Sequence, residues 1–351
     1  MPTVHRAQIF SIDGAPTCEE ARHHLIHHPD GALVVGDDGM IDWIGDFRNL
    51  PDEYQADGVE DHRPGFVLPG FIDCHVHFPQ TYAIDSYGGG QLLEWLERCI
   101  FPSESRLADP EFGRQAAVEF NNRRIAAGTT TALVFGSAFP AAQDALFEDS
   151  IRRGLRIISG RGIQTVGPPS AGPLLTTEDA AIDLAAAEIE KWHNTDTGDP
   201  ATALAQVAVV PRFSLSVTRA TLAALGELYD SVRGRGVYFH THLNENNRPG
   251  TGEVDSVKAA YQVDTYLDTY DGRFLPGSAV GGPSMLGRRS VMAHAVHCQD
   301  AELARMRATE TSIAHCPTSQ LFLGSGTMPW RRTIASGVTV GLGTDFAGGD
   351  E

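Results

Sequence analysis

The chain has 351 residues, of which 42% are hydrophobic and 21% charged, a composition typical of a soluble globular protein with one large core or two smaller ones. Its formal net charge of -18 argues against a nucleic-acid partner, because binding to phosphates needs clustered lysine and arginine side chains. The five cysteines form no C-x-x-C pair, and no hydrophobic stretch approaches the length of a membrane span. We therefore expect a cytoplasmic protein that binds neither membranes nor nucleic acids.

The N-terminal part of the chain predicts a small β region. Short apolar runs alternate there with turn residues, and Asp37, Asp38 and Gly39 have the composition of a hairpin turn between two strands. The pattern changes within residues 64–69, which begin and end with proline. We expect one domain over residues 1–66 and a second over residues 67–351.

The second region alternates apolar, β-branched runs with helical patterns. The runs cover residues 70–76, 129–136, 155–163, 205–215, 236–243, 289–296, 311–317 and 338–345. The helical patterns include residues 91–100, 110–127, 177–193, 218–232 and 300–309. Eight such strands with intervening helices predict a (β/α)8 barrel. The alternative is a doubly wound sheet, which would usually carry a glycine-rich phosphate turn after an early strand.

Histidine and aspartate recur at one end of these predicted strands. His75 and His77 end the first strand, and because residues two apart share one face of a strand, both imidazoles could bind a single metal ion. His242, His294 and Asp345 end the fifth, sixth and eighth strands. Barrels of this kind keep their active sites at the C-terminal ends of the strands, so we predict a metal site there.

Two further histidines compete for a place in this site. His240 shares a strand face with His242 but lies closer to the middle of the barrel, so we expect it to pack as a buried polar residue. His315 ends the seventh strand, and its role stays open.

Eight segments of the sequence form a combined pattern. They are PGFIDCHVHFPQ, LLEWLERCIFPSESR, AAGTTTALVF, PRFSLS, THLNEN, VMAHAVH, TSIAHCPTSQLFLGSG and VGLGTDFAGG. Together they resemble the guanine deaminase family of the amidohydrolase superfamily. The resemblance implies a distorted (β/α)8 barrel with a small N-terminal β-sandwich region over residues 1–66. It also implies a homodimer that binds a small purine and hydrolyses guanine to xanthine and ammonia.

The resemblance also implies the metal ligands and the groups that transfer protons. One Zn2+ per chain would be bound by His75, His77, His242, His294 and Asp345. Imidazole and carboxylate groups suit zinc, which must keep one position open for water. In an alternative seen in related deaminases, His294 orients the water instead. Glu245 would be the catalytic proton carrier, and Asp345 would have a second, catalytic role as hydrogen-bond acceptor for the water.

Substrate contacts follow from the same resemblance. They would involve Gln80, Arg212 and Phe213, together with His242, Glu245 and Asp345. An amide offers both a donor and an acceptor to a purine edge, and a guanidinium suits a carbonyl acceptor. A phenyl ring can pack on the flat base, although plain core packing is the alternative for Phe213.

The sequence departs from the family in three places. It has GRGIQTVGPPSAGP after the third strand and Gln320 in place of an asparagine, so another amino-substituted heterocycle, such as a modified purine or a pterin, remains an alternative substrate. The family continues well beyond the eighth strand, whereas this sequence ends six residues after Asp345 (351 minus 345). We expect the C-terminal part of the family fold to be missing, with an open sheet edge and exposed apolar surface. A catalytically silent metal-binding barrel is therefore a further alternative.

Overall fold

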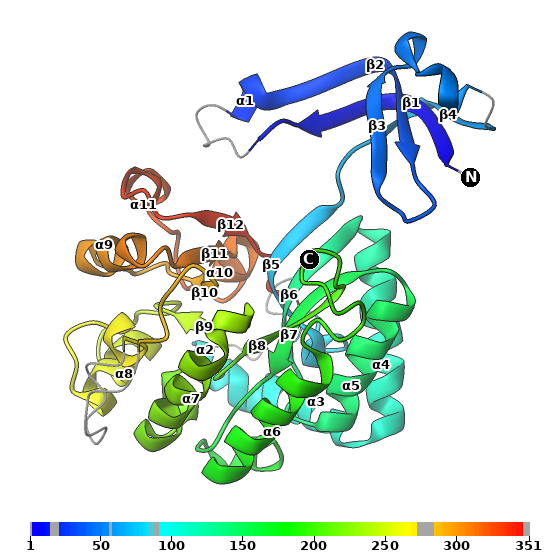
Figure 1. Cartoon of the computed structure of the whole chain (residues 1–351). Coiled ribbons are helices and arrows are strands. Elements are labelled where there is room, and N and C mark those ends of the chain that lie inside the picture. The colour runs from blue at the N-terminus through cyan, green and yellow to red at the C-terminus, as the bar shows by residue number, and fades with distance from the viewer. Residues whose placement is uncertain are drawn as a thin grey trace. The chain divides into compact units, whose positions relative to one another are not determined.

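The computed structural model describes residues 2–14, 21–55, 58–84, 86, 91–271 and 284–346. The chain divides into two compact units, Met1–Gly70 and Phe71–Glu351 (Figure 1). The division lies four residues after the expected boundary at residue 66. Cys18 lies outside the described residues.

The first unit contains one four-stranded sheet in the order β3-β2-β1-β4. Its strands are β1 (Thr3–Ile12), β2 (Leu25–Val35), β3 (Ile41–Asp46) and β4 (Val59–Val67), and the short helix α1 spans Ala21–His24. Strands β1, β2 and β3 pair antiparallel, whereas β4 runs parallel to β1.

The turn between β2 and β3 has the expected hairpin geometry. The Gly36 amide donates to the Met40 carbonyl at 2.8 Å, and Gly39 adopts a φ of +80°, which favours glycine. The hairpin prediction is therefore confirmed.

The expected β-sandwich differs from what the first unit shows. All four strands of its described residues belong to one sheet, so there is no second sheet in this part of the chain. The buried side chains Val4, Ala32 and Val34 pack instead against Phe47 and Tyr54, which come from 3-10 turns between β3 and β4. The segment between β3 and β4 therefore covers the buried face of the sheet, the position that a second sheet would take in a sandwich.

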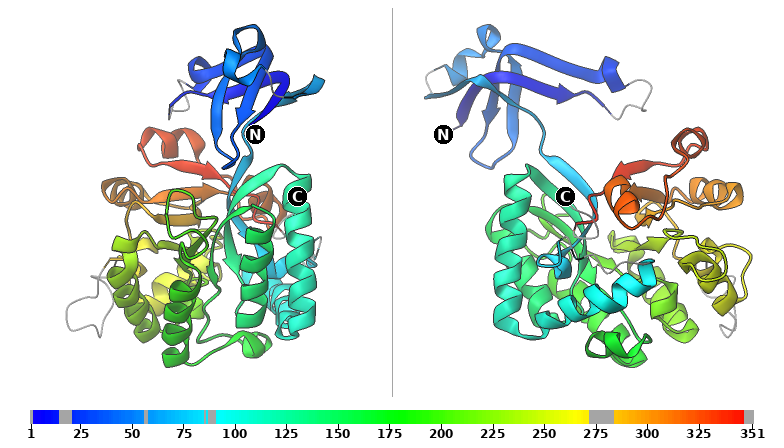
Figure 2. Two further views of the ribbon diagram at one scale, coloured as in Figure 1. Left: turned by 45° about the vertical axis from the view of Figure 1, so that its right-hand side comes forward. Right: turned by 180° about the vertical axis from the view of Figure 1, so that it is seen from behind.

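The second unit is built on eight parallel strands that neighbour one another in chain order (Figures 1 and 2). They are β5 (Phe71–His77), β6 (Thr129–Gly136), β7 (Arg156–Arg161), β8 (Ala205–Val209), β9 (Tyr238–Leu243), β10 (Ser290–His294), β11 (Ser312–His315) and β12 (Val340–Leu342). Each lies within or beside one of the eight apolar runs, so the strand prediction is confirmed.

The first and last strands are joined by hydrogen bonds just beyond β12. The Asp345 amide donates to the His75 carbonyl and the His77 amide donates to the Phe346 carbonyl, both at 2.8 Å. The Asp73 carboxylate accepts from the Thr344 amide at 3.0 Å and from its hydroxyl at 2.6 Å. The sheet is therefore a nearly closed (β/α)8 barrel, and the doubly wound alternative is wrong.

Helices surround the strands of this barrel, and some of them lie at the end of the strands where Asp345 is found (Figure 2). They are α2 (Leu92–Trp95), continued by a π-helical turn (Leu96–Ile100), α3 (Phe101–Ser105), α4 (Pro110–Ala126), α5 (Pro140–Arg152), α6 (Glu178–Trp192), α7 (Arg219–Val232), α8 (Glu253–Tyr261), α9 (Asp300–Ala308), α10 (Pro317–Phe322) and α11 (Trp330–Ala335). The five helical patterns of the sequence are confirmed. Among the described residues, no helix has the length and apolar character needed to cross a membrane.

Helix α7 illustrates why these segments form where they do. The Thr218 side chain accepts a hydrogen bond from the Thr221 amide and so caps the first turn. Leu222, Leu225 and Tyr229 follow at intervals of three and four residues, lie on one face, and are all buried. One apolar stripe therefore holds the helix against the barrel.

Candidate metal centre and active site

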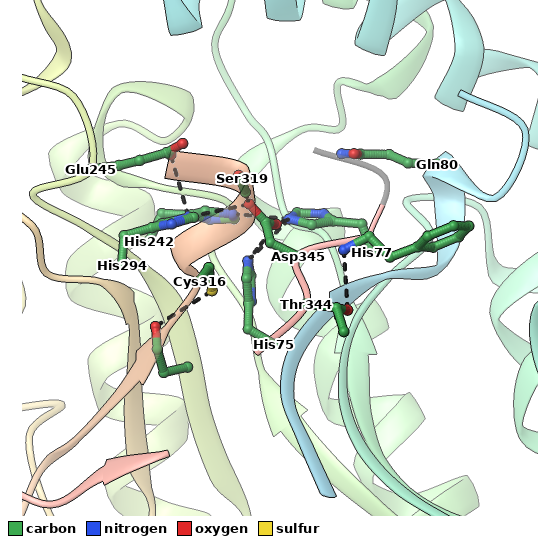
Figure 3. A network of polar contacts seen from close by, with 12 residues as sticks. His75, His77, Gln80, His242, Glu245, His294, Cys316, Ser319, Thr344 and Asp345 are labelled. Atoms are coloured by element: carbon green, nitrogen blue, oxygen red, sulfur yellow. Dashed lines mark hydrogen bonds and ion pairs between the residues drawn. The ribbon is translucent and has the colours of Figure 1, made fainter. Parts of the chain in front are cut away.

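The strand ends bring five predicted residues into one buried cluster. His75 and His77 lie on β5, His242 on β9 and His294 at the end of β10, while Asp345 follows β12 (Figure 3). Each of the five residues is at most 8% exposed. Residues that are far apart in the sequence thus meet at the C-terminal end of the barrel.

Four ligand atoms of this cluster converge on one point. The Nε2 atom of His77 lies 3.1 Å from the Nε2 atoms of both His75 and His242. The Oδ1 atom of Asp345 lies 3.1 Å from the Nε2 atoms of His75 and His77. One ligand atom from each of these four residues lies within 4.8 Å of the others. Three imidazoles and one carboxylate form a donor set that suits a transition metal such as zinc.

A chain of hydrogen bonds determines which nitrogen of His75 carries its proton. Burial lowers the pKa of His240 to about 4 and that of His75 to about 3, so both rings are neutral at neutral pH. The Nδ1 atom of His240 must donate to the Val291 carbonyl at 2.9 Å, because a carbonyl only accepts. Its Nε2 atom therefore accepts from His75 Nδ1 at 2.7 Å. The lone pair of His75 Nε2 is left to face the cluster.

The same argument applies to His242. Burial lowers its pKa well below the usual value, and its Nδ1 atom donates to the Arg212 carbonyl at 2.7 Å. Its Nε2 lone pair therefore also faces the cluster.

The Nε2 atom of His77 has three acceptors 3.1 Å away, namely His75 Nε2, His242 Nε2 and Asp345 Oδ1. Even if His77 carried a proton on Nε2, that proton could bond to only one of them. The remaining acceptors, such as His75 Nε2 and Asp345 Oδ1 at 3.1 Å, would still face one another without a proton between them. This arrangement fits a bound cation. The hydrogen bonds that His75 and His242 donate from Nδ1, the ring nitrogen facing away from the cluster, are typical of metal-ligating histidines.

His294 belongs to a different group of side chains. Its Nε2 atom lies 3.3 Å from Glu245 Oε2 and 3.9 Å from Asp345 Oδ2, and the three residues form a second cluster. His294 is not a member of the four-residue group around His77. Its backbone φ of +73° is unusual for a residue with a side chain, and such strain occurs preferentially at functional sites.

The environment of Glu245 favours its protonated form. The residue is 3% exposed, and burial, followed by the negative charges of Asp345 and Glu253, raises the pKa of Glu245 well above its usual value. Burial also lowers the pKa of His294 to about 3. The proton of this neighbouring pair therefore resides on Glu245, which suits a general acid.

Sequence reasoning missed two residues that position these groups. Ser319 donates from its hydroxyl to Asp345 Oδ2 at 2.5 Å (Figure 3), and Glu253 accepts from the Glu245 and Asn246 amides at 3.0 and 3.1 Å. Ser319 lies in the segment TSIAHCPTSQLFLGSG, which carries part of the family resemblance, but such a motif does not tell which side chain a serine contacts.

The predicted substrate residues line the same hollow as the cluster. It is lined by His77, Gln80, Leu92, Trp95, Leu96, Arg212, Phe213, His242, Glu245, Glu253, His294, Leu323 and Asp345. Phe213 is 7% exposed and also packs in an apolar cluster with Trp95 and Leu96, so it both packs and lines the hollow. Apolar side chains form one part of this lining and polar or ionisable ones the larger part, and a hollow in which polar groups converge beside apolar surface is typical of small-molecule sites.

The two departures from the family do not line this pocket directly. Gln164, Val166 and Pro168 line a second hollow that shares Leu96 and Phe213 with the first. Gln320 is 1% exposed, and neither polar atom of its amide has a hydrogen-bond partner among the described residues.

His315 also lies outside the residues that line the pocket. Its ring lies 5.7 Å from that of Trp330, centroid to centroid.

Comparison with known proteins identifies relatives of this arrangement. A probable guanine deaminase of Deinococcus radiodurans is 41% identical over 326 residues, which cover 91% of this chain and 68% of that protein. The solved Escherichia coli guanine deaminase superposes with a TM-score of 0.86 at 32% identity, covering all of this chain and 75% of that one. The solved guanine deaminase of Bradyrhizobium japonicum superposes with a TM-score of 0.87 at 27% identity, and the match covers 100% of this chain and 71% of that one.

The family match covers most of the barrel unit. The model of the amidohydrolase family matches residues 66–350, the region that contains all five residues of the buried cluster and every predicted substrate contact. The chain therefore belongs to the amidohydrolase family.

Proposed function

We propose that this chain is a zinc-dependent hydrolase that converts guanine and water to xanthine and ammonia. The observation that carries the proposal is one hollow that combines the converging ligand atoms, the Glu245 carboxyl group with its raised pKa, and the polar side chains of Gln80 and Arg212. Two relatives that cover 91% and 94% of this chain are named a probable guanine deaminase and a guanine deaminase, which supports the same reaction.

One zinc ion per chain would be held by His75, His77, His242 and Asp345, whose ligand atoms converge. When bound, zinc would lower the pKa of a water molecule to about 7 and so supply a nucleophile at neutral pH. His294 lies beside Glu245 and Asp345 instead, a position from which it can orient that water. The geometry favours this role over direct coordination.

Glu245 supplies the proton transfers that the reaction needs. Addition of water at C2 places negative charge on the neighbouring ring nitrogen N3, which the Glu245 carboxyl group can protonate. The added water gives up both of its protons: the resulting Glu245 carboxylate can take one and deliver it to the amino group, which then leaves as ammonia, and it can keep the other, which restores its acid form. The raised pKa of Glu245, caused first by burial, favours the protonated form that this first transfer needs.

The pocket wall can recognise the other edge of the base. Arg212 can donate to the O6 carbonyl of guanine, and the Gln80 amide can bond the adjacent ring nitrogen. Phe213 and Trp95 supply apolar surface for the flat ring.

The decisive experiment measures ammonia release from guanine and bound zinc in the same sample of the purified 351-residue chain. We expect about one zinc per chain and ammonia release for the wild type. Glu245→Gln should keep its zinc and lose activity by at least ~10²-fold, because it removes the proton carrier and no ligand. Wild-type-like activity in this variant would exclude Glu245 from the mechanism.

The same assay distinguishes the alternative functions. Zinc without ammonia from guanine, but with ammonia from a modified purine or a pterin, would indicate another heterocycle. Gln164 and Pro168 give this alternative a structural basis, since they contact the hollow behind Leu96 and Phe213 and can alter the pocket shape through them. Zinc without ammonia from any of these compounds would indicate a silent barrel.

The proposal includes a cytoplasmic location and a homodimer. The odd number of cysteines and the absence of a long apolar helix among the described residues support the first. Exposed apolar side chains, including Leu321 at 66% and Trp330 at 42%, support association. Sedimentation equilibrium of the purified chain would give the mass of the assembly.

A further inference from the structure

Glu104, on α3, connects the two polar residues of the pocket wall. It is 3% exposed, and its Oε2 atom accepts from Arg212 Nη1 at 2.7 Å, while Oε1 accepts from Arg212 Nη2 at 3.1 Å. The same Oε1 atom accepts from Gln80 Nε2 at 2.9 Å. One buried carboxylate therefore holds both side chains that would contact the substrate.

These contacts determine the orientation of the Gln80 amide. A carboxylate only accepts hydrogen bonds, so the amide must turn its NH2 group towards Glu104 and its carbonyl oxygen away from it. That oxygen, Oε1, is buried and has no hydrogen-bond partner among the described residues, although Gln80 lines the pocket. A buried acceptor without a partner costs free energy unless a ligand satisfies it.

The contacts also determine what Arg212 offers. Two of its five N–H groups bond to Glu104, and its guanidinium lies 5.2 Å from the ring centre of Phe101 and 5.3 Å from that of Phe135. The side chain is thus held in one plane with its charge paired, so its remaining N–H groups act as donors to a neutral carbonyl.

We propose that Glu104 is a positioning residue that sets the hydrogen-bond polarity of the pocket. With Glu104 in place, the wall offers a donor from Arg212 beside an acceptor from Gln80. This pattern matches a lactam edge, in which a ring N–H adjoins a carbonyl, and it opposes the amidine edge of an aminopurine, in which both groups are reversed. The inference rests on the proposed function, because it places the substrate against this wall.

Hypoxanthine and adenine are a matched pair of probes, because they share one ring system and differ in this edge. Equilibrium dialysis of each labelled base against the zinc-loaded chain gives two dissociation constants without any need for turnover. The wild type should bind hypoxanthine at least about tenfold more tightly than adenine, since each mismatched polar group stays unpaired.

The Glu104→Gln variant removes the constraint on the Gln80 amide, because a glutamine at this position can donate as well as accept. The ratio of the two dissociation constants should then fall about tenfold, while bound zinc stays near one per chain. Asp271→Asn is the matched control: Asp271 is another buried carboxylate, bound by Arg305 at 2.7 and 2.9 Å, and it does not line the pocket. Its ratio should equal that of the wild type.

Glu104→Asp covers the case in which Glu104→Gln does not fold, because it keeps the charge beside Arg212 and only shortens the side chain. It should shift the ratio in the same direction. An unchanged ratio in the folded Glu104 variants, or a wild type that does not prefer hypoxanthine, would overturn the inference. Absence of ammonia from guanine would instead overturn the proposed function and leave this ratio measurable.

Discussion

At the residue scale, the candidate site depends on groups that hydrogen-bond to the candidate metal ligands from behind. His240 holds His75, the Arg212 carbonyl holds His242, and Ser319 holds Asp345. Each contact directs a lone pair or a carboxylate oxygen towards the common centre. Loss of such a contact to a metal ligand typically lowers the metal affinity by about 10- to 100-fold.

His240 permits a test of this arrangement. His240→Leu removes the acceptor for His75 Nδ1, so the His75 ring loses its fixed tautomer and orientation. We expect the zinc affinity to fall about tenfold to a hundredfold, measured by competition with a chelator. His240→Gln is the control, because its amide can still donate to Val291 and accept from His75. Equal loss in both variants would mean that His240 acts only by filling space.

The sequence predicted the residues that meet at the site better than the contacts between them. His75 and Asp345 could be found because both end strands, and strand ends of a barrel converge. The pairing of Glu104 with Arg212 could not be predicted, since the two residues are 108 positions apart and only the packing of α3 against the barrel brings them together. Likewise, spacing placed His240 on the correct face but did not indicate its bond to His75.

At the element scale, helix α6 carries a carboxyl group whose burial makes stability depend on pH. Glu188 accepts from the Arg161 amide at 3.0 Å, and burial raises the pKa of Glu188 to about 8 despite the nearby Arg161. Between its ordinary value and about 8, the folded chain keeps a proton that the unfolded chain has lost. Stability therefore falls as the pH rises through this window and levels off above it.

Glu188→Gln should remove this loss, because the amide cannot ionise and still accepts from Arg161. We expect the free energy of unfolding of the wild type to fall by about 2 kcal/mol more than that of the variant between about pH 5 and pH 8. Denaturant unfolding of both proteins at several pH values measures this difference in the free energy of unfolding. Asp183→Asn, an exposed position on the same helix, should leave the wild-type slope unchanged. Parallel curves for wild type and Glu188→Gln would contradict the assignment.

At the scale of the whole molecule, the barrel closes through contacts made by the segment after β12. Thr344 bonds to Asp73 through both its amide and its hydroxyl, next to the candidate metal ligands His75 and Asp345. Alternating runs in the sequence predicted eight strands, but nothing in their pattern shows how the first meets the last. Gly343 lets the segment after β12 approach β5 closely. A Cβ at this position would lie 2.9 Å from the backbone nitrogen of His75, so only glycine fits without a shift.

Thr344→Val tests whether this closure supports the metal centre. The change keeps the shape of the side chain but leaves the buried Asp73 carboxylate with one donor fewer, which should cost about 1–3 kcal/mol of unfolding free energy. Zinc affinity should fall as well, because the neighbouring Asp345 is held through the same segment. Thr344→Ser keeps the hydroxyl group and should resemble the wild type. Lower stability with unchanged zinc affinity would separate barrel closure from metal binding.

The contact between Asp73 and Thr344 spans 271 positions of the chain. Contacts between such distant residues form slowly in folding, because most of the chain must be ordered before the loop between them closes. During synthesis, the histidines of β5 therefore emerge long before Asp345 does. Until that residue arrives, an early metal ion would meet an incomplete set of ligands, so metal capture by the full set would mark one of the last events in the folding of each molecule.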